Sequence, residues 1–214
     1  MAGEPETLDS DEPLPRKIHR HNYDRLLMLS DGVFAIAITL LVLDLRPPHE
    51  WSGSLPDLVR NSWRALFGYV FGFAAVAGFW AAHRALFARL RHVDGPATAL
   101  SLLLLLFIGL VPAAAALASV HGLAKGMPVY LLLVATIAGV QTALWAYAAF
   151  LGNLVDSSIS YRDRVIRTAL LLTPLVIFGY LFAVPATSLS LWTASPLIVL
   201  VVVARILRRR MSAR

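Results

Sequence analysis

Residues 25–44 read RLLMLSDGVFAIAITLLVLD, and this stretch decides what class of protein the chain encodes. A helix needs roughly 20 mostly apolar residues to cross a bilayer core of about 30 Å, and the stretch has that length and character. It also holds an acid, Asp31, about two helical turns from its start. A carboxylate inside a membrane span is costly and is normally paired or functional. We therefore expect a transmembrane helix that does more than pack.

Five further stretches have the same apolar character, which makes six expected spans in all. We place them at about 26–45, 63–86, 97–118, 128–151, 168–184 and 189–207, with short joins that carry Pro, Gly or charge. The whole chain is 58% hydrophobic and 15% charged, whereas soluble domains are about half apolar and about a quarter charged. There is no cysteine, so disulfides and thiolate metal sites are excluded. The sequence therefore predicts an all-α integral membrane protein with six transmembrane helices.

The basic residues gather on one side of this alternating arrangement. That side holds 15 of the 19 Lys and Arg residues: Arg16, Lys17, Arg20, Arg25, Arg84, Arg89, Arg91, Arg162, Arg164, Arg167, Arg205, Arg208, Arg209, Arg210 and Arg214. Cytoplasmic loops carry such an excess, so we expect both termini in the cytoplasm. The net charge of +6 follows membrane topology and does not indicate a nucleic-acid partner.

Three domains follow from this arrangement. Residues 1–22 are polar, first acidic and then basic, and we expect a disordered cytoplasmic tail there. The six-helix transmembrane domain is expected over 23–208, followed by a basic cytoplasmic end at 209–214.

The first helix should present two different faces. At about 100° per residue, Ile36, Leu40 and Leu43 fall within roughly 60° of arc, and Thr39 lies on the flank of this stripe. Asp31 points roughly 140° away from Ile36, so we expect it to face helices of its own subunit. Arg25 lies six residues before Asp31, a spacing that does not meet on one helix face. Any pairing between those two charges must pass through a neighbouring helix.

The first helix resembles the first-helix signature of the transmembrane-protein-175 family, which comprises the lysosomal-type potassium channels and their prokaryotic relatives. The family signature is Arg-x-x-x-Phe-Ser-Asp, and here Leu29 replaces the Phe between Arg25 and Asp31. The stretch Phe79-Trp80-Ala81-Ala82-His83 is similar to the family's Trp-x-x-His element.

This resemblance implies a homotetramer in which four first helices line a central pore. The family lacks a carbonyl filter and constricts its pore with rings of large apolar side chains, which by position are Ile36, Leu40 and Leu43. Thr39 would supply a ring of hydroxyls near the constriction. The resemblance implies a structural polar network at the cytoplasmic end, in which we place Arg25, Ser30, Asp31 and His83.

An apolar ring gates by dewetting and makes an ion shed much of its hydration shell. Potassium holds its water less tightly than sodium, so a dehydration barrier favours potassium. In a tetramer, Asp44 would form a ring of four carboxylates at the outer mouth and concentrate cations there. We expect a potassium-preferring leak channel in a prokaryotic plasma membrane, with potassium as the permeant ion, the bilayer and its own copies as partners, and no cofactor.

Two other functions stay open. A proton-coupled secondary transporter would relay protons through Asp31 and His83 and contact its substrate through Thr39. A structural membrane protein would only pack its helices and conduct nothing. An enzyme is not expected, because Ser30 has no partner His in its own span and the sequence has no phosphate-binding loop. Gln141, the most polar side chain of the fourth span, should hydrogen-bond to a neighbouring helix.

Overall fold

The computed structural model describes residues 14–45 and 53–184, and the regular secondary structure of these residues is helical, apart from one isolated β-bridge between Leu90 and Val155. The helices are α1 (Leu14–Leu40), a 3-10 turn η1 (Leu41–Asp44), α2 (Leu55–Phe87), α3 (Gly95–Gly109), α4 (Val111–Ala146), a π-helical turn η2 (Tyr147–Leu151) and α5 (Tyr161–Ala183). The all-α prediction is confirmed for the described residues.

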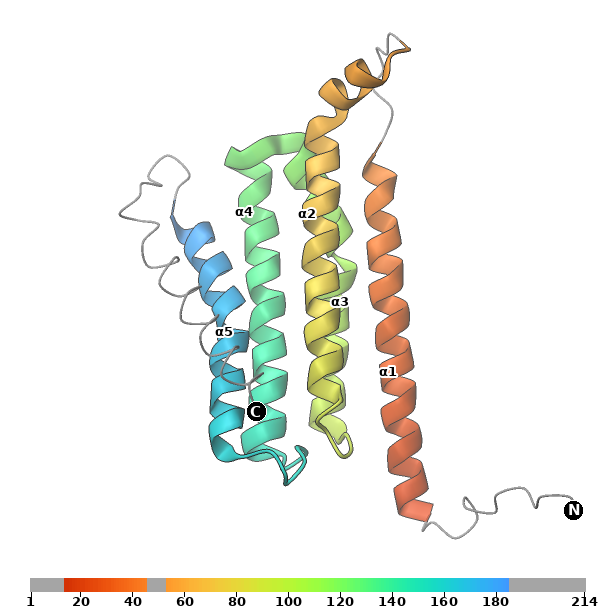
Figure 1. Ribbon diagram of the computed structural model, residues 1–214, viewed down its shortest axis with the longest axis vertical. Coiled ribbons are helices and arrows are strands. Elements are labelled where there is room, and N and C mark those ends of the chain that lie inside the picture. The colour runs from red at the N-terminus through yellow and green to blue at the C-terminus, as the bar shows by residue number, and fades with distance from the viewer. Residues whose placement is uncertain (1–13, 46–52, 185–214) are drawn as a thin grey trace, which may run out of the picture.

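Five segments are long and apolar enough to cross a membrane, and they run in alternating directions (Figure 1). They are His21–Leu43, Ala65–Phe87, Gly95–Gly122, Ala124–Leu151 and Tyr161–Ala183. The third and fourth segments meet inside α4, where Gly122 adopts a φ of 68° that only glycine takes without strain. Five of the six expected spans are therefore confirmed, and the sixth, at 189–207, lies outside the described residues.

Three helices begin earlier than the apolar pattern predicts. The helix α1 starts at Leu14, so the expected disordered tail at 1–22 is wrong for residues 14–22. Pro15 lies in the first turn, where a missing backbone N–H has no cost, and no breaker follows it before the apolar run. The helices α2 and α5 begin directly after Ser54 and Ser160. The Ser160 hydroxyl accepts from the Asp163 N–H and so caps α5, whereas Pro56 lies in the first turn of α2, where proline is favoured.

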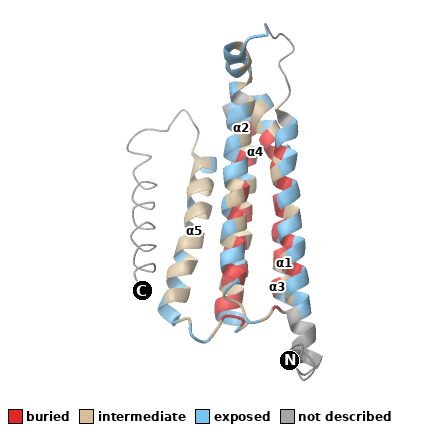
Figure 2. Ribbon diagram, turned by 45° about the vertical axis from the view of Figure 1, so that its right-hand side comes forward, coloured by how far each residue is buried: buried red, intermediate tan, exposed pale blue. Residues whose placement is uncertain are grey.

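The core lies between α1, α2, α3 and α4, whose inner sides carry the buried residues (Figure 2). From α1 and the first residue of η1 the buried residues are Leu26, Ser30, Phe34, Ala37 and Leu41, which recur every three or four positions. This spacing keeps them on one face of the helix. By contrast, α5 packs on α4 at the edge of the bundle and has no buried residue. One face of α1 is therefore fixed against its own chain.

Two connections are joined at the end of the bundle where α1 begins (Figure 1). The Arg91 backbone N–H donates to the Leu154 carbonyl at 2.9 Å, and the Asp156 N–H donates to the Arg89 carbonyl at 3.0 Å. The Arg91 side chain also pairs with the Asp156 carboxylate at 3.1 Å. Hydrogen bonds from Ser158 and from Arg91 lower the pKa of Asp156 to about 2. These contacts hold the α2–α3 and α4–α5 connections together.

At the other end, α1 and η1 lie close to α2. A Cβ added at Gly72 would lie 3.0 Å from Cδ2 of Leu41, whereas a Cβ at Gly78 would have no atom within 4 Å. Glycine at position 72 therefore permits a close approach that a larger residue would prevent.

We predict that Gly72→Leu destabilises the protein by about 1–3 kcal/mol, because the new side chain overlaps Leu41 in a packed region. The measurement is the melting temperature of the detergent-solubilised protein. The matched control is Gly78→Ala, which should leave the melting temperature unchanged or raise it slightly, since alanine favours a helix. Equal melting temperatures for Gly72→Leu and the wild type would refute this packing argument.

Candidate functional site

The face of α1 that its own chain does not cover carries the predicted stripe. Ile36, Leu40 and Leu43 are 60%, 42% and 65% exposed. At about 100° per residue, Ile36 and Leu40 point roughly 150° and roughly 110° away from the buried direction of Phe34 and Leu41. Large apolar side chains are thus aligned on a surface that only lipid or another protein chain can cover.

The geometry changes at the end of this stripe. Residues 41–44 form a 3-10 turn, and the Leu45 N–H donates to the Val42 carbonyl at 3.0 Å. Three residues complete one turn in this geometry, compared with 3.6 in an α-helix. Leu43 therefore lies close to the line of Leu40, one turn further along. Asp44 ends the turn.

Thr39 lies beside the stripe, as predicted, and is exposed. Its hydroxyl donates a hydrogen bond to the Ile36 carbonyl at 2.9 Å. Because the proton is used within the helix, the lone pairs of the hydroxyl oxygen remain as acceptors.

Ser30 and His83 form one polar pair inside the bundle, and both are fully buried. The Ser30 hydroxyl donates to the Leu26 carbonyl at 2.8 Å, and His83 Nε2 lies 3.2 Å from the same oxygen. With the serine proton directed to the Leu26 carbonyl, His83 donates to the Ser30 oxygen in the tautomer that carries its proton on Nε2. The ring also packs against Phe34 and Phe87. The pair therefore fixes the contact between α1 and α2.

Asp31 belongs to a second pair, with Trp80 of α2. The indole Nε1 of Trp80 donates to Oδ1 of Asp31 at 2.7 Å. The guanidinium of Arg84 lies 5.1 Å from the centre of the Trp80 ring, which is within the range of a cation–π interaction. The Asp31 carboxylate thus accepts a hydrogen bond from the Trp80 indole, and the Arg84 guanidinium lies over the ring of that indole. Asp31 contacts a helix of its own chain, as its direction on α1 predicted.

The hydrogen bonds of the predicted polar residues fall into two pairs. Ser30 bonds to His83 and Asp31 bonds to Trp80, while no ion pair between Arg25 and Asp31 occurs in the described residues 14–45 and 53–184. The sequence singled out Trp80 together with His83 but did not predict Trp80 as the donor to Asp31. The signal was its spacing, because Trp80 and His83 are three apart and so lie on one face of α2, opposite Ser30 and Asp31.

A metal centre is not among the features of this site. Within 14–45 and 53–184, no three His, Cys, Asp or Glu side chains come together in a way that could hold a metal ion.

The helices and these paired polar groups define an α-helical, multi-pass membrane protein. The family model described as "Endosomal/lysosomal potassium channel TMEM175" matches residues 25–112, which include α1 from Arg25 onward, both polar pairs and α2. A potassium channel of Streptomyces collinus is 32% identical over 155 residues, covering 68% of this chain and 75% of that protein. The chain belongs to the TMEM175 family of potassium channels, which are ion channels and not enzymes.

A crystal structure supports the same assignment. It is that of a lysosomal potassium-selective channel TMEM175 homolog from Chamaesiphon minutus, and it matches with a TM-score of 0.61 and 28% identity over 89% of this chain and 98% of the other. The bovine "Endosomal/lysosomal proton channel TMEM175" is 33% identical over 117 residues, which is 50% of this chain but 23% of the bovine protein. This chain thus spans about a quarter of that relative's length.

We predict that Asp31→Asn and Asp31→Ala differ in their effect on the stability of the protein. Asp31→Asn keeps an oxygen that accepts from Trp80, whereas Asp31→Ala leaves the indole N–H unpaired. The alanine variant should therefore be less stable than the asparagine variant by about 1–3 kcal/mol. The melting temperature and the monodispersity of the purified protein measure this difference.

Trp80→Phe is the companion variant, because it removes the donor and leaves the carboxylate. It should resemble Asp31→Ala. An asparagine variant as unstable as the alanine variant would show that the hydrogen bond is not what matters. An asparagine variant that assembles normally but no longer conducts would contradict a structural role for Asp31.

Proposed function

We propose that the chain is one subunit of a potassium-preferring leak channel, in which α1 from each of four copies lines a central pore. The observation that carries this proposal is the exposure of Ile36, Leu40 and Leu43 on a face that the subunit leaves uncovered. A fourfold arrangement of α1 would place these side chains in successive rings around an axis. The family assignment supports potassium as the permeant ion.

The constriction would work by removing water from the ion. Leu40 and Leu43 lie one turn apart on nearly one line, so their rings would form a continuous apolar section. An apolar section of this kind opposes the passage of hydrated ions and gates by dewetting. Potassium loses its water more readily than sodium, so the same barrier favours potassium. No charge in these rings would hold an ion.

Thr39 would ease part of this dehydration. Its hydroxyl already donates to the Ile36 carbonyl. The lone pairs of its oxygen would therefore coordinate a passing cation. A ring of four such oxygens would replace a few of the waters that potassium loses.

The orientation is inferred from charge. The end of the bundle that holds the start of α1 also holds Arg84, Arg89, Arg91 and Arg162. The positive-inside tendency places this end in the cytoplasm. Asp44, at the opposite end of α1, would then form a carboxylate ring at the outer mouth that raises the local cation concentration. A bacterial plasma membrane is the setting we propose.

The polar pairs of α1 and α2 would be structural. Ser30 with His83 and Asp31 with Trp80 join the pore-lining helix to the helix behind it, and Arg25 would contribute its charge at the cytoplasmic entrance. The alternative of a proton-coupled transporter requires a relay between Asp31 and His83. These two side chains bond to different partners, which gives that alternative no support.

We predict that Leu40→Ala and Leu43→Ala reduce the preference for potassium over sodium. Each change widens one apolar ring, so an ion sheds less of its hydration shell. The measurement is passive potassium and sodium flux into proteoliposomes that contain the purified protein. The double variant should show a smaller potassium-to-sodium ratio than either single variant, since the two rings act in series.

Leu172→Ala is the matched control, because Leu172 is an exposed leucine on α5, at the edge of the bundle away from α1. It should keep the wild-type ratio. Unchanged ratios in both α1 variants would overturn the pore assignment. Flux that requires a proton gradient would favour the transporter, and no flux from a correctly folded oligomer would count against a leak channel.

A further inference from the structure

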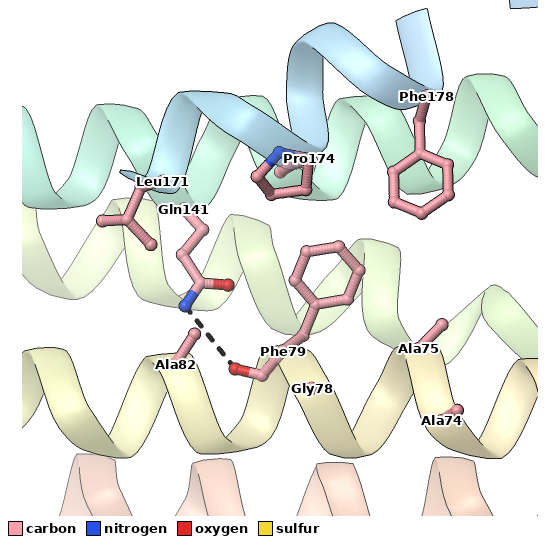
Figure 3. A pocket seen from close by; sticks show the side chains of 10 residues that line it. Ala74, Ala75, Gly78, Phe79, Ala82, Gln141, Leu171, Pro174 and Phe178 are labelled. Carbon is pink, nitrogen blue, oxygen red and sulfur yellow. Dashed lines mark hydrogen bonds between the residues drawn. The ribbon is translucent and has the colours of Figure 1, made fainter. Parts of the chain in front are cut away.

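A cavity of about 290 Å³ lies between α2, α4 and α5, away from the face of α1 discussed above (Figure 3). Small residues of α2 form one wall, and Pro174 and Phe178 of α5 form the opposite one. Ala74 and Gly78 on the α2 wall are exposed, so the cavity opens to the surroundings of the bundle. For a membrane-spanning bundle, those surroundings are the bilayer. The volume is at the lower end of the range for small-molecule sites.

One polar side chain, Gln141 of α4, reaches this cavity, and its hydrogen bonding is incomplete. The side chain is 2% exposed. Its amide Nε2 donates to the Phe79 carbonyl over a long 3.5 Å, and its Oε1 has no hydrogen-bond partner. In Figure 3 this oxygen points toward the space between Phe79 and Pro174. A buried carbonyl oxygen without a donor is costly, so the cavity lacks one hydrogen-bond donor.

Water fits this space poorly. A buried water normally has two to four polar partners. The side chains around the cavity other than Gln141 are those of Ala, Gly, Phe, Leu and Pro, which offer none. A single water at Gln141 would satisfy the oxygen but would leave its own remaining groups against hydrocarbon.

Charged ligands fit no better. A carboxylate or a phosphate brings further acceptors to an oxygen that needs a donor. A cation would give up its hydration for one neutral oxygen, at a large desolvation cost. The class of ligand that remains for this cavity is an uncharged molecule with a short apolar body and one hydroxyl group.

The geometry points to a binding site for such a neutral amphiphile, a medium-chain alcohol drawn from the bilayer, whose hydroxyl donates to Gln141 Oε1 while its chain lies along Ala74 and Gly78. Small residues on α2 make room for the chain. A Cβ at Gly78 would have no atom within 4 Å, which marks open space at that position. This site is separate from the proposed pore and does not depend on conduction.

The test uses an octanol that carries a photoactivatable diazirine, added to the full-length protein in liposomes. Labelled positions are mapped by mass spectrometry after irradiation. We expect adducts on the cavity residues of α2, α4 and α5, and we expect excess unlabelled octanol to suppress them. A diazirine-bearing octane of the same length, which lacks the hydroxyl, is the matched probe. Absence of saturable labelling at the cavity would overturn the proposal.

Two variants separate shape from hydrogen bonding. Gly78→Leu fills the cavity and should abolish labelling by both probes. Gln141→Met keeps the volume of the side chain and removes the acceptor, so labelling by the alcohol should fall about fivefold, as expected for one neutral hydrogen bond. Labelling by the alkane should not fall in that variant.

Labelling is compared only among variants whose melting temperature and oligomer size equal those of the wild type. Gly78→Ala replaces Gly78→Leu if the leucine variant does not fold. The alanine variant should weaken labelling without abolishing it. An equal loss of alcohol and alkane labelling in Gln141→Met would show that the amide oxygen does not bind the hydroxyl. Full labelling of Gly78→Leu would show that the probe lies elsewhere.

Discussion

The packing of one face of α1 against the rest of its own chain sets the direction of every other side chain on that helix. Phe34, Ala37 and Leu41 are all buried, and they share a core with residues of α2, α3 and α4. A helix held along this face cannot turn about its axis without losing those contacts, because packed interiors tolerate little displacement. Ile36 and Leu40 must therefore point away from the subunit. The uncovered apolar face is a consequence of this packing, and the proposed pore depends on it.

The polar pairs add a second constraint near the other end of α1. A hydrogen bond has a narrow range of length, so the contacts of Ser30 with His83 and of Asp31 with Trp80 fix the height of α1 relative to α2. Both pairs are made from neighbouring residues on α1 and from residues three apart on α2. The apolar contacts alone would tolerate a shift of one helical turn, since leucine and alanine recur along both helices. The polar contacts would not, because a shifted carboxylate would have no donor in an apolar environment.

Hydropathy predicted that the spans exist, but it did not predict the residues at which their helices begin. A run of 20 apolar residues has few alternatives to a membrane helix, so the five described spans followed from the sequence. The helices α2 and α5 start at Leu55 and Tyr161, outside the apolar runs, with Pro56 in the first turn of α2 and the Ser160 cap before α5. The stripe on α1 was predictable because helical spacing alone sets it, although the 3-10 turn that brings Leu43 toward Leu40 was not. Trp80 as the donor to Asp31 required knowledge of which helices are neighbours. Gln141 was expected to bond to another helix, and its amide nitrogen does so with α2.

Small residues on α2 have opposite consequences at two depths, and this difference explains why the bundle contains a cavity. At Gly72 the absence of a side chain lets Leu41 fill the space, so small size produces tight packing. At Gly78 nothing fills it, since α5 lies at the edge of the bundle and buries none of its own residues. Pro174 removes one backbone N–H from α5 at this level, where a proline commonly bends a helix.

Gln141 reaches this cavity with only half of its amide satisfied. Its nitrogen bonds to the Phe79 carbonyl of α2, and its oxygen has no hydrogen-bond partner. A bundle that only packed its helices would place an apolar residue at this position, because a half-satisfied buried amide is less stable than a hydrocarbon of the same shape. The retained polar group therefore favours an occupant that supplies the missing donor.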